Sequence, residues 1–246
     1  MKRNEALERE AQSVNPLPAG TSAVFSADSL SLLRQTAKPV RVSAGDCLYR
    51  ENEPANRLYL VTAGSFKVSK PLGDGTSVTL YLHIPGDLFG EPDPLGLSAH
   101  RFEARALEDS EAGEILQAEV NGLLQANGAF ALEFMNWMGT IHRMTQSKFR
   151  DLLLYGKSGA LCSLLLRLSN MYGPERGGRP VIGKRITNSE MAEMIGATRE
   201  SVNRMLSDMR SQGVISVERG RIVINDPDYL RNVCHCESCT KDICRM

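Results

Sequence analysis

Residues 187–206, TNSEMAEMIGATRESVNRML, predict two short helices joined by a tight turn. Thr187, followed three positions later by Glu190, is a capping-box pattern that starts the first helix, and Gly196 ends it. Thr198 caps the second helix. The apolar face of that helix, which stops at Gly213, consists of Met205, Leu206 and Met209. Two helices with this spacing are typical of a helix-turn-helix.

Two β-type runs, VISVE and RIVIN, follow these helices and make the unit a winged helix-turn-helix. In such a domain the first turns of the second helix enter the major groove of double-stranded DNA. The residues predicted to contact DNA are Arg199, Glu200, Ser201, Asn203 and Arg204. Arginine can donate two hydrogen bonds to guanine, and glutamate can accept one from cytosine. The alternatives are a protein-binding winged helix and, for Glu200 with Arg204, an ordinary surface ion pair.

The first half of the chain has the periodicity of β-strands. From Val40 to about Leu116, short β-type runs alternate with turn signals at regular intervals. The tetrapeptide GDGT lies between two of these runs, where a hairpin needs a tight turn. This pattern predicts a small all-β roll.

A long helix is expected from Ala129 to about Tyr155, because the period there becomes helical and no proline occurs. Its apolar stripe consists of Phe134, Trp137, Met138, Ile141, Met144, Thr145, Leu152 and Tyr155. Beside a small roll this stripe stays exposed unless it meets a partner, so a parallel homodimer is preferred over the core helix of a monomer. Asp151 interrupts the stripe shortly before Gly156 and Gly159, which mark a hinge.

The composition and the first residues of the chain indicate where the protein acts and what kind of nucleic-acid surface it can have. Lysine plus arginine equals aspartate plus glutamate, 29 each, so any nucleic-acid surface must be a local patch. The charged start, MKRNEALERE, lacks an apolar signal region, and no run of about 18 apolar residues occurs. We therefore expect a cytoplasmic protein without membrane contact, in a compartment where thiols stay reduced.

The stretch CHCESCTKDIC, residues 234–244, holds four of the six cysteines. Cys236, Cys239 and Cys244 have the spacing C-x2-C-x4-C, in which a chelating pair is followed by a third thiol that can reach the same centre. In a reduced compartment this set favours an iron–sulfur cluster or zinc over exposed unpaired thiols. Cys234 and His235 are further potential ligands.

From about Ser26 to Leu230 the chain resembles the Crp/Fnr family of bacterial transcription factors. The resemblance rests on GDLFGE at residues 86–91, on the long helix and on the stretch TNSEMAEMIGATRESVNRML. It implies a regulator, not an enzyme, that binds an inverted repeat as a homodimer and contacts RNA polymerase. The residues that it implies for reading a TGTGA-type half-site are Arg199, Glu200 and Arg204.

Cyclic-nucleotide sensing is disfavoured by one segment of the roll. Family members that bind cyclic nucleotides place an Arg-Ser pair, ahead of an Arg-Ala pair, on the phosphate. Here the segment reads EPDPLGLSAHRFEARA, with Phe102 after Arg101. Because phenylalanine offers a phosphate no side-chain donor, a cyclic-nucleotide regulator is retained only as an alternative.

The cysteine-rich tail resembles that of the Bacillus-type Fnr branch, where a C-terminal C-x2-C-x4-C and an aspartate of the dimer helix bind a [4Fe-4S] cluster. The ligands implied here are Cys236, Cys239, Cys244 and Asp151. The resemblance implies an oxygen-responsive regulator of anaerobic respiration genes that binds DNA while its cluster is intact. One alternative is that Asp151 only pairs with Lys148 or Tyr155 at the helix end, with Cys234 or His235 as fourth ligand. The others are a zinc-stapled regulator that does not sense oxygen, and an iron–sulfur enzyme or electron carrier.

The predicted fold class is α+β, with an N-terminal jelly roll like that of cyclic-nucleotide-binding domains, a long dimerisation helix and a C-terminal winged helix-turn-helix. The predicted boundaries are a flexible lead-in over residues 1–25, a sensor-like roll over 26–118, dimerisation helices over 119–156, the DNA-binding domain over 157–230 and a cluster-binding tail over 231–246.

Overall fold

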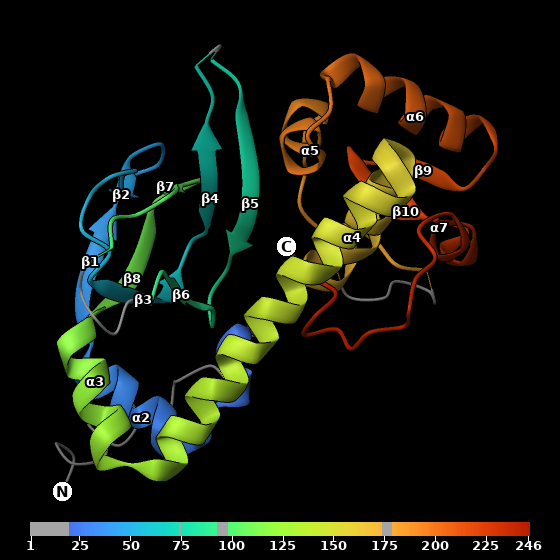
Figure 1. Cartoon of the computed structure of the whole chain (residues 1–246). Coiled ribbons are helices and arrows are strands. Elements are labelled where there is room, and N and C mark those ends of the chain that lie inside the picture. The colour runs from blue at the N-terminus through green and yellow to red at the C-terminus, as the bar shows by residue number, and fades with distance from the viewer. Residues whose placement is uncertain (1–19, 74, 93–97, 174–178) are drawn as a thin grey trace, which may run out of the picture.

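The computed structural model of the chain describes residues 20–73, 75–92, 98–173 and 179–246. It consists of two lobes joined by a long helix (Figure 1). The first lobe is a β-roll with short helices at one end. The second lobe is built from helices and a small two-stranded sheet.

The β-roll contains two four-stranded antiparallel sheets. The first has the order β1 (Lys38–Val42), β8 (Ser110–Leu116), β3 (Arg57–Ala63), β6 (Leu88–Gly90). The second has the order β2 (Cys47–Tyr49), β7 (Glu103–Ala106), β4 (Phe66–Pro71), β5 (Ser77–His83). Apolar side chains such as Tyr59, Phe66 and Phe89 form its core. Their strand neighbours Leu58 and Leu88 point to the other face, and they are also buried, against the helices. The predicted roll is confirmed.

Short helices close one end of the roll: η1 (Thr21–Val24), α2 (Ala27–Thr36) and α3 (Gln117–Ala126). Thr21 joins η1 to the turn before β6, since its N–H donates to Asp87 Oδ1 over 2.7 Å. Phe25 is buried and stacks on Phe130, with 5.8 Å between ring centroids. Of the predicted lead-in, residues 1–19 lie outside the described residues. Residues 20–25 are part of the fold rather than a flexible segment.

Helix α4 (Gly128–Tyr172) is the long helix between the lobes. Its backbone leaves the helical conformation at Gly156, with φ 58° and ψ −164°, a left-handed φ that glycine adopts without steric cost. The predicted hinge therefore lies at this residue. By length and composition α4 is apolar enough to cross a membrane, but 61% of its apolar window is buried inside the fold, which is the burial expected of a core helix.

The predicted dimer stripe of α4 needs a correction. Phe134, Trp137 and Met144 are at most 4% exposed because this face packs within the chain against the roll and its helices. A neighbouring face is the exposed one, and it includes Met138 and Leu152 of the predicted stripe. Its large apolar side chains are Leu132, Met135, Met138, Phe149, Leu152, Leu153 and Leu154. Four of them, at positions 132, 135, 149 and 153, fit the a and d positions of a heptad repeat.

The second lobe contains α5 (Asn188–Ile195), α6 (Arg199–Ser211), β9 (Ile215–Glu218), β10 (Arg221–Ile224) and α7 (Pro227–Val233). Its core is formed by the last turns of α4 together with these elements. Members of this core include Leu165, Leu168, Val202, Leu206, Ile224 and Leu230. Cys234, Cys244 and Met246 belong to the same core, so the cysteine-rich segment is packed rather than trailing.

Candidate functional site

Helices α5 and α6 form the predicted helix-turn-helix. The capping box is present, because Glu190 N–H donates to Thr187 Oγ1 over 3.2 Å and Thr187 N–H donates to Glu190 Oε2 over 2.6 Å. Gly196 ends α5 in the left-handed conformation, with φ 60°. The side chain of Thr198 accepts from Ser201 N–H over 3.2 Å and starts α6. The local sequence signals therefore act as predicted.

The outer face of α6 carries the residues predicted to contact DNA. Arg199, Glu200, Asn203 and Arg204 are exposed, while Ser201 is half-buried and hydrogen-bonded to Thr198. Val202, Leu206 and Met209 anchor the opposite face in the core. The side chain of Asn203 is hydrogen-bonded within the domain, because its Oδ1 accepts from Asn188 Nδ2 over 3.1 Å.

The wing is the hairpin of β9 and β10, which pair antiparallel from Ile215–Ile224 to Glu218–Arg221. Arg219 and Gly220 turn the chain with φ values of 52° and 76°, as a two-residue hairpin with the primed turn requires. Arg185 donates to the carbonyl of Arg219 over 3.1 Å, and it places another cation beside the wing.

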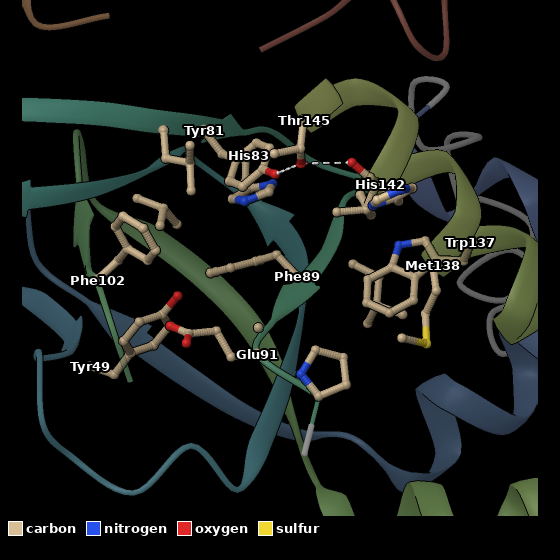
Figure 2. Close-up of a pocket in the computed structure, with 16 residues that line it drawn as sticks. Tyr49, Tyr81, His83, Phe89, Glu91, Phe102, Trp137, Met138, His142 and Thr145 are labelled. Atoms are coloured by element: carbon tan, nitrogen blue, oxygen red, sulfur yellow. Dashed lines mark hydrogen bonds between the residues drawn. The ribbon is translucent and has the colours of Figure 1, made fainter. Parts of the chain in front are cut away.

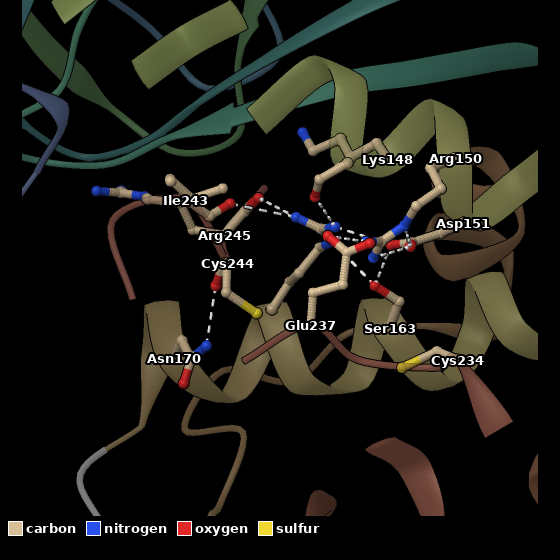
Figure 3. A network of polar contacts seen from close by, with 12 residues as sticks. Lys148, Arg150, Asp151, Ser163, Asn170, Cys234, Glu237, Ile243, Cys244 and Arg245 are labelled. Atoms are coloured by element: carbon tan, nitrogen blue, oxygen red, sulfur yellow. Dashed lines mark hydrogen bonds and ion pairs between the residues drawn. The ribbon is translucent and has the colours of Figure 1, made fainter. Parts of the chain in front are cut away.

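Asp151 lies at the hinge and is 2% exposed (Figure 3). Arg150 Nη2 lies 2.9 Å from its Oδ1, and Arg167 Nη2 lies 2.8 Å from its Oδ2. Ser163 donates a further short hydrogen bond to Oδ2. Neither Lys148 nor Tyr155 is the partner of this carboxylate. The aspartate that the sequence singled out is therefore a buried anion held by two arginines.

Arg167 was not predicted, although an arginine within the apolar run LCSLLLRLSN is a signal for a buried charge with a partner. It is 3% exposed. Besides Asp151, its guanidinium donates to the hydroxyls of Ser163 and Ser147 and to two carbonyls of the tail. Arg167 thus joins the hinge to the cysteine-rich segment.

The cysteine-rich tail contacts the hinge through Glu237 and His235. Its backbone turns at His235 and Ser238, where φ is 45° and 53°. Cys239 and Cys244 interact through a hydrogen bond. Glu237 forms an ion pair with Arg150, so the segment lies beside Asp151 (Figure 3). His235 instead stacks on Tyr155, with 4.7 Å between ring centroids, and this contact draws it toward the end of the first part of α4.

Burial keeps the inner thiols protonated. It raises the pKa of Cys244 to about 12, with an opposing contribution from Arg167 and reinforcing ones from Cys239 and Cys236. Burial, followed by the charges of Cys236 and Asp151, raises the pKa of Cys234 to about 11. Asp151 acts in this way on Cys234 but is not among the causes for Cys244.

The donor set suits a soft metal centre, but the side chains do not yet point at one. Within the described residues no group of three His, Cys, Asp or Glu side chains is arranged to hold a metal ion. The residue types, three thiols that include a chelating pair and one carboxylate, fit the ligand chemistry of an iron–sulfur cluster or of zinc. Coordination would require the thiols to turn toward one centre and Asp151 to exchange its arginine contacts.

A cavity of about 330 Å³ lies between the roll and α4 (Figure 2). It is lined mainly by apolar and aromatic side chains, which include Tyr49, Tyr81, Phe89, Phe102, Trp137 and Met138. Among the described lining residues none is lysine or arginine. Both oxygens of Glu91 accept from the backbone N–H of Arg101 over 3.2 Å. Two histidines, His83 and His142, also line it. Residues 93–97 of the segment EPDPLGLSAHRFEARA lie outside the described residues, so the expectation against cyclic-nucleotide binding stays a prediction.

Comparison with known proteins matches both lobes to described families. Residues 39–127 match the cyclic nucleotide-binding domain, and residues 159–233 match the Crp-like helix-turn-helix domain. The chain is 40% identical over 231 residues to a protein of Bacillus subtilis (strain 168) described as an anaerobic regulatory protein. The match covers 92% of this chain and 95% of that protein. The chain belongs to the Crp/Fnr family. It is therefore a transcription regulator with a DNA-binding helix-turn-helix domain.

Solved structures of Crp/Fnr proteins share this fold. FixK2 from Bradyrhizobium japonicum aligns with a TM-score of 0.68 at 22% identity, over 80% of this chain and 96% of that one. A CooA mutant from Carboxydothermus hydrogenoformans aligns with a TM-score of 0.73 at 19% identity, over 88% of this chain and 96% of that one. These likenesses support the order of roll, long helix and helix-turn-helix.

Proposed function

We propose that this Crp/Fnr protein is an oxygen-responsive transcription regulator that acts as a homodimer and holds a [4Fe-4S] cluster on Cys236, Cys239, Cys244 and Asp151. In this proposal it acts in the cytoplasm and binds a TGTGA-type inverted repeat while the cluster is intact. It contacts RNA polymerase and controls genes of anaerobic respiration.

One observation supports the cluster assignment: Glu237, which lies between Cys236 and Cys239 in sequence, pairs with Arg150, and Arg150 also holds the buried Asp151 at the hinge. Asp151 comes from α4 and the thiols come from the last residues of the chain, so a shared centre ties the DNA-binding lobe to the dimer helix. When bound, such a cluster supplies an oxygen-labile centre whose loss releases these ligands. A tether of this kind acts by stabilising one arrangement of the recognition helices over another.

The homodimer is supported by the exposed heptad face of α4. Leu132, Met135, Phe149 and Leu153 are between 62% and 67% exposed, and a second copy of the helix would cover them. In such a pair each protomer offers one α6 to the DNA. The exposure of Arg199, Glu200 and Arg204 supports the proposal that these three side chains of one protomer together read one half-site.

A structural zinc is the second candidate for the tail. Cys234 is 2% exposed and lies within electrostatic reach of Cys236, so four thiols are available for a tetrahedral site. This regulator would bind DNA irrespective of oxygen. Metal content separates the two candidates.

The deciding experiment is an ultraviolet-visible spectrum with iron and sulfide analysis on protein purified without oxygen, repeated after brief exposure to air alongside a DNA-binding assay. We expect about four irons and four sulfides per chain, a broad absorption band that bleaches in air, and a parallel loss of DNA binding. Cys236→Ser should abolish the band. Cys162→Ser is the matched control, since Cys162 is buried outside the proposed ligand set.

A colourless protein that contains zinc and binds DNA equally well in air would refute the oxygen-sensing function. Asp151→Ala tests the fourth ligand separately. If the band of that variant equals the band of the unmodified protein, Asp151 is not a ligand and Cys234 or His235 takes its place.

A further inference from the structure

The last residues of the chain are buried between the two lobes. Cys244, Arg245 and Met246 are 8%, 4% and 3% exposed, although the last helix ends at Val233. In Figure 1 this end of the chain lies between the β-roll and the second half of α4. A short segment outside any helix or strand reaches such burial only where other parts of the fold hold it.

On the side of the DNA-binding lobe the backbone of this segment is held by two residues of α4. Asn170 Nδ2 donates to the carbonyl of Cys244 over 2.9 Å. Arg167 Nη1 donates to the carbonyls of Ile243 and Arg245 over 3.3 and 3.4 Å (Figure 3). Arg167 also holds Asp151, so the position of the segment depends on the hinge.

On the side of the roll the segment is held by a side chain. Arg245 Nη2 lies 2.9 Å from Asp87 Oδ2, and the two side chains are 4% and 1% exposed. Asp87 is itself rigid, because its oxygens accept from the N–H groups of Thr21 and Ile84 over 2.7 and 2.9 Å. Although burial opposes ionisation, His83 and the charge of Arg245 hold the pKa of Asp87 below its ordinary value. The contact therefore joins a charged guanidinium to a carboxylate.

The other ion pairs between the lobes, among the described residues, are nearer the surface. Lys67 Nζ lies 2.9 Å from Glu193 Oε2, with side chains 18% and 30% exposed. Lys184 Nζ lies 3.4 Å from Glu108 Oε1, with side chains 35% and 55% exposed. Water screens such pairs, whereas a buried pair that loses one partner leaves an uncompensated charge. Of the ion pairs between the lobes, the buried pair of Arg245 with Asp87 therefore stabilises the observed arrangement of the lobes most strongly over other arrangements.

We propose that Arg245 is a positioning residue that latches the C-terminal segment, and with it the DNA-binding lobe, onto Asp87 of the β-roll. Asp87 lies in the turn that leads into β6, within the stretch GDLFGE. The latch belongs to the chain itself and needs no bound group. Arg245 follows Cys244 directly, so ligation by Cys244 would be transmitted to the roll through this contact; that last step rests on the proposed function.

The test is hydrogen exchange with mass spectrometry on the full chain, purified in air, for Arg245→Met, Arg245→Lys and Lys67→Met. Arg245→Met removes the charge but keeps most of the bulk. It should accelerate amide exchange about tenfold or more in peptides that cover residues 240–246 and 84–90. Arg245→Lys, which retains the charge, should restore part of the protection. Lys67→Met, which breaks the other close pair between the lobes, should leave both peptides unchanged.

Two results would overturn the latch. One is unchanged exchange at residues 240–246 in Arg245→Met. The other is exchange that rises equally in β3 and β8, because that would mark a general loss of stability. A cycle with Asp87→Asn sharpens the assignment: the double variant should exchange no faster at residues 240–246 than Arg245→Met alone.

These measurements do not depend on a cluster, so the latch and the proposed function can fail separately. Iron analysis of the unmodified protein tests the cluster. If iron is present, loading it should change the exchange of residues 84–90 in the unmodified chain but not in Arg245→Met. An equal change in both proteins would show that the cluster reaches the roll by another route.

Discussion

Helix α6 and the C-terminal segment of residues 234–246 obtain their structures in opposite ways. The start of α6 is set by its neighbours in sequence, because Thr198 caps it within three residues, and its functional heads face solvent. The C-terminal segment lies outside any helix or strand. Besides a few local backbone hydrogen bonds, it is held by residues 74 to 158 positions earlier, such as Asn170 and Asp87. A region whose partners are local can be recognised in the sequence, whereas one whose partners are distant cannot.

The largest effect is expected from a substitution that breaks the hinge contacts of the C-terminal segment. Asp151→Ala leaves Arg167 buried without its carboxylate, and it should lower the free energy of unfolding by about 3–5 kcal/mol. Urea denaturation of the protein without bound metal measures this. Asp228→Ala is the matched control, since the pair of Asp228 with Arg231 is 80% and 50% exposed and should contribute less than about 1 kcal/mol. Equal effects of the two changes would contradict the buried network.

The next prediction concerns DNA binding by α6, and its substitution should leave the free energy of unfolding unchanged. Arg204→Ala should weaken binding to a TGTGA-type palindrome by about 1–3 kcal/mol, because a bidentate contact to a base is lost. Fluorescence anisotropy on matched specific and random duplexes measures this. Arg210→Ala, also exposed but in the last turn of the helix, should have little effect on specificity. Equal weakening by Arg204→Ala on both duplexes would make Arg204 a phosphate contact instead.

A smaller effect depends on pH. Cys234 has an ordinary thiol pKa of 9.0 in the unfolded chain and a pKa raised to about 11 in the fold, where burial disfavours the thiolate. The stability that the fold gains by keeping this thiol protonated is complete below pH 9.0, and it is lost as the pH rises toward 11. The free energy of unfolding should then fall by up to about 1.4 kcal/mol per pH unit from this thiol. Cys234→Ala should reduce that slope, and an unaltered slope would show that the thiol does not titrate in this range.

The smallest effect lies within the same segment. Glu237 pairs with Arg150, but its side chain is 72% exposed. Glu237→Gln should therefore change the free energy of unfolding by less than about 1 kcal/mol, and added salt should reduce the difference further. A larger loss in urea denaturation would mean that this exposed pair, and not only the buried network around Asp151, holds the segment in place.

The sequence alone determined the elements whose signals are local. Alternation and turn residues predicted the β-roll, and capping residues with two glycines predicted the helix-turn-helix. Gly156 was recognised as the hinge. Each of these depends on residues a few positions apart, where backbone preference and side-chain period act directly.

Only the tertiary structure decided which faces are covered and which charges meet. Periodicity placed Phe134 and Trp137 on an apolar stripe, but it could not tell that these two side chains are covered within the chain while Phe149 and Leu153 stay exposed. Asp151 stood out in the sequence, yet its arginine partners did not. The pairing of Arg245 with Asp87 spans 158 positions and arises because folding removes both groups from water together.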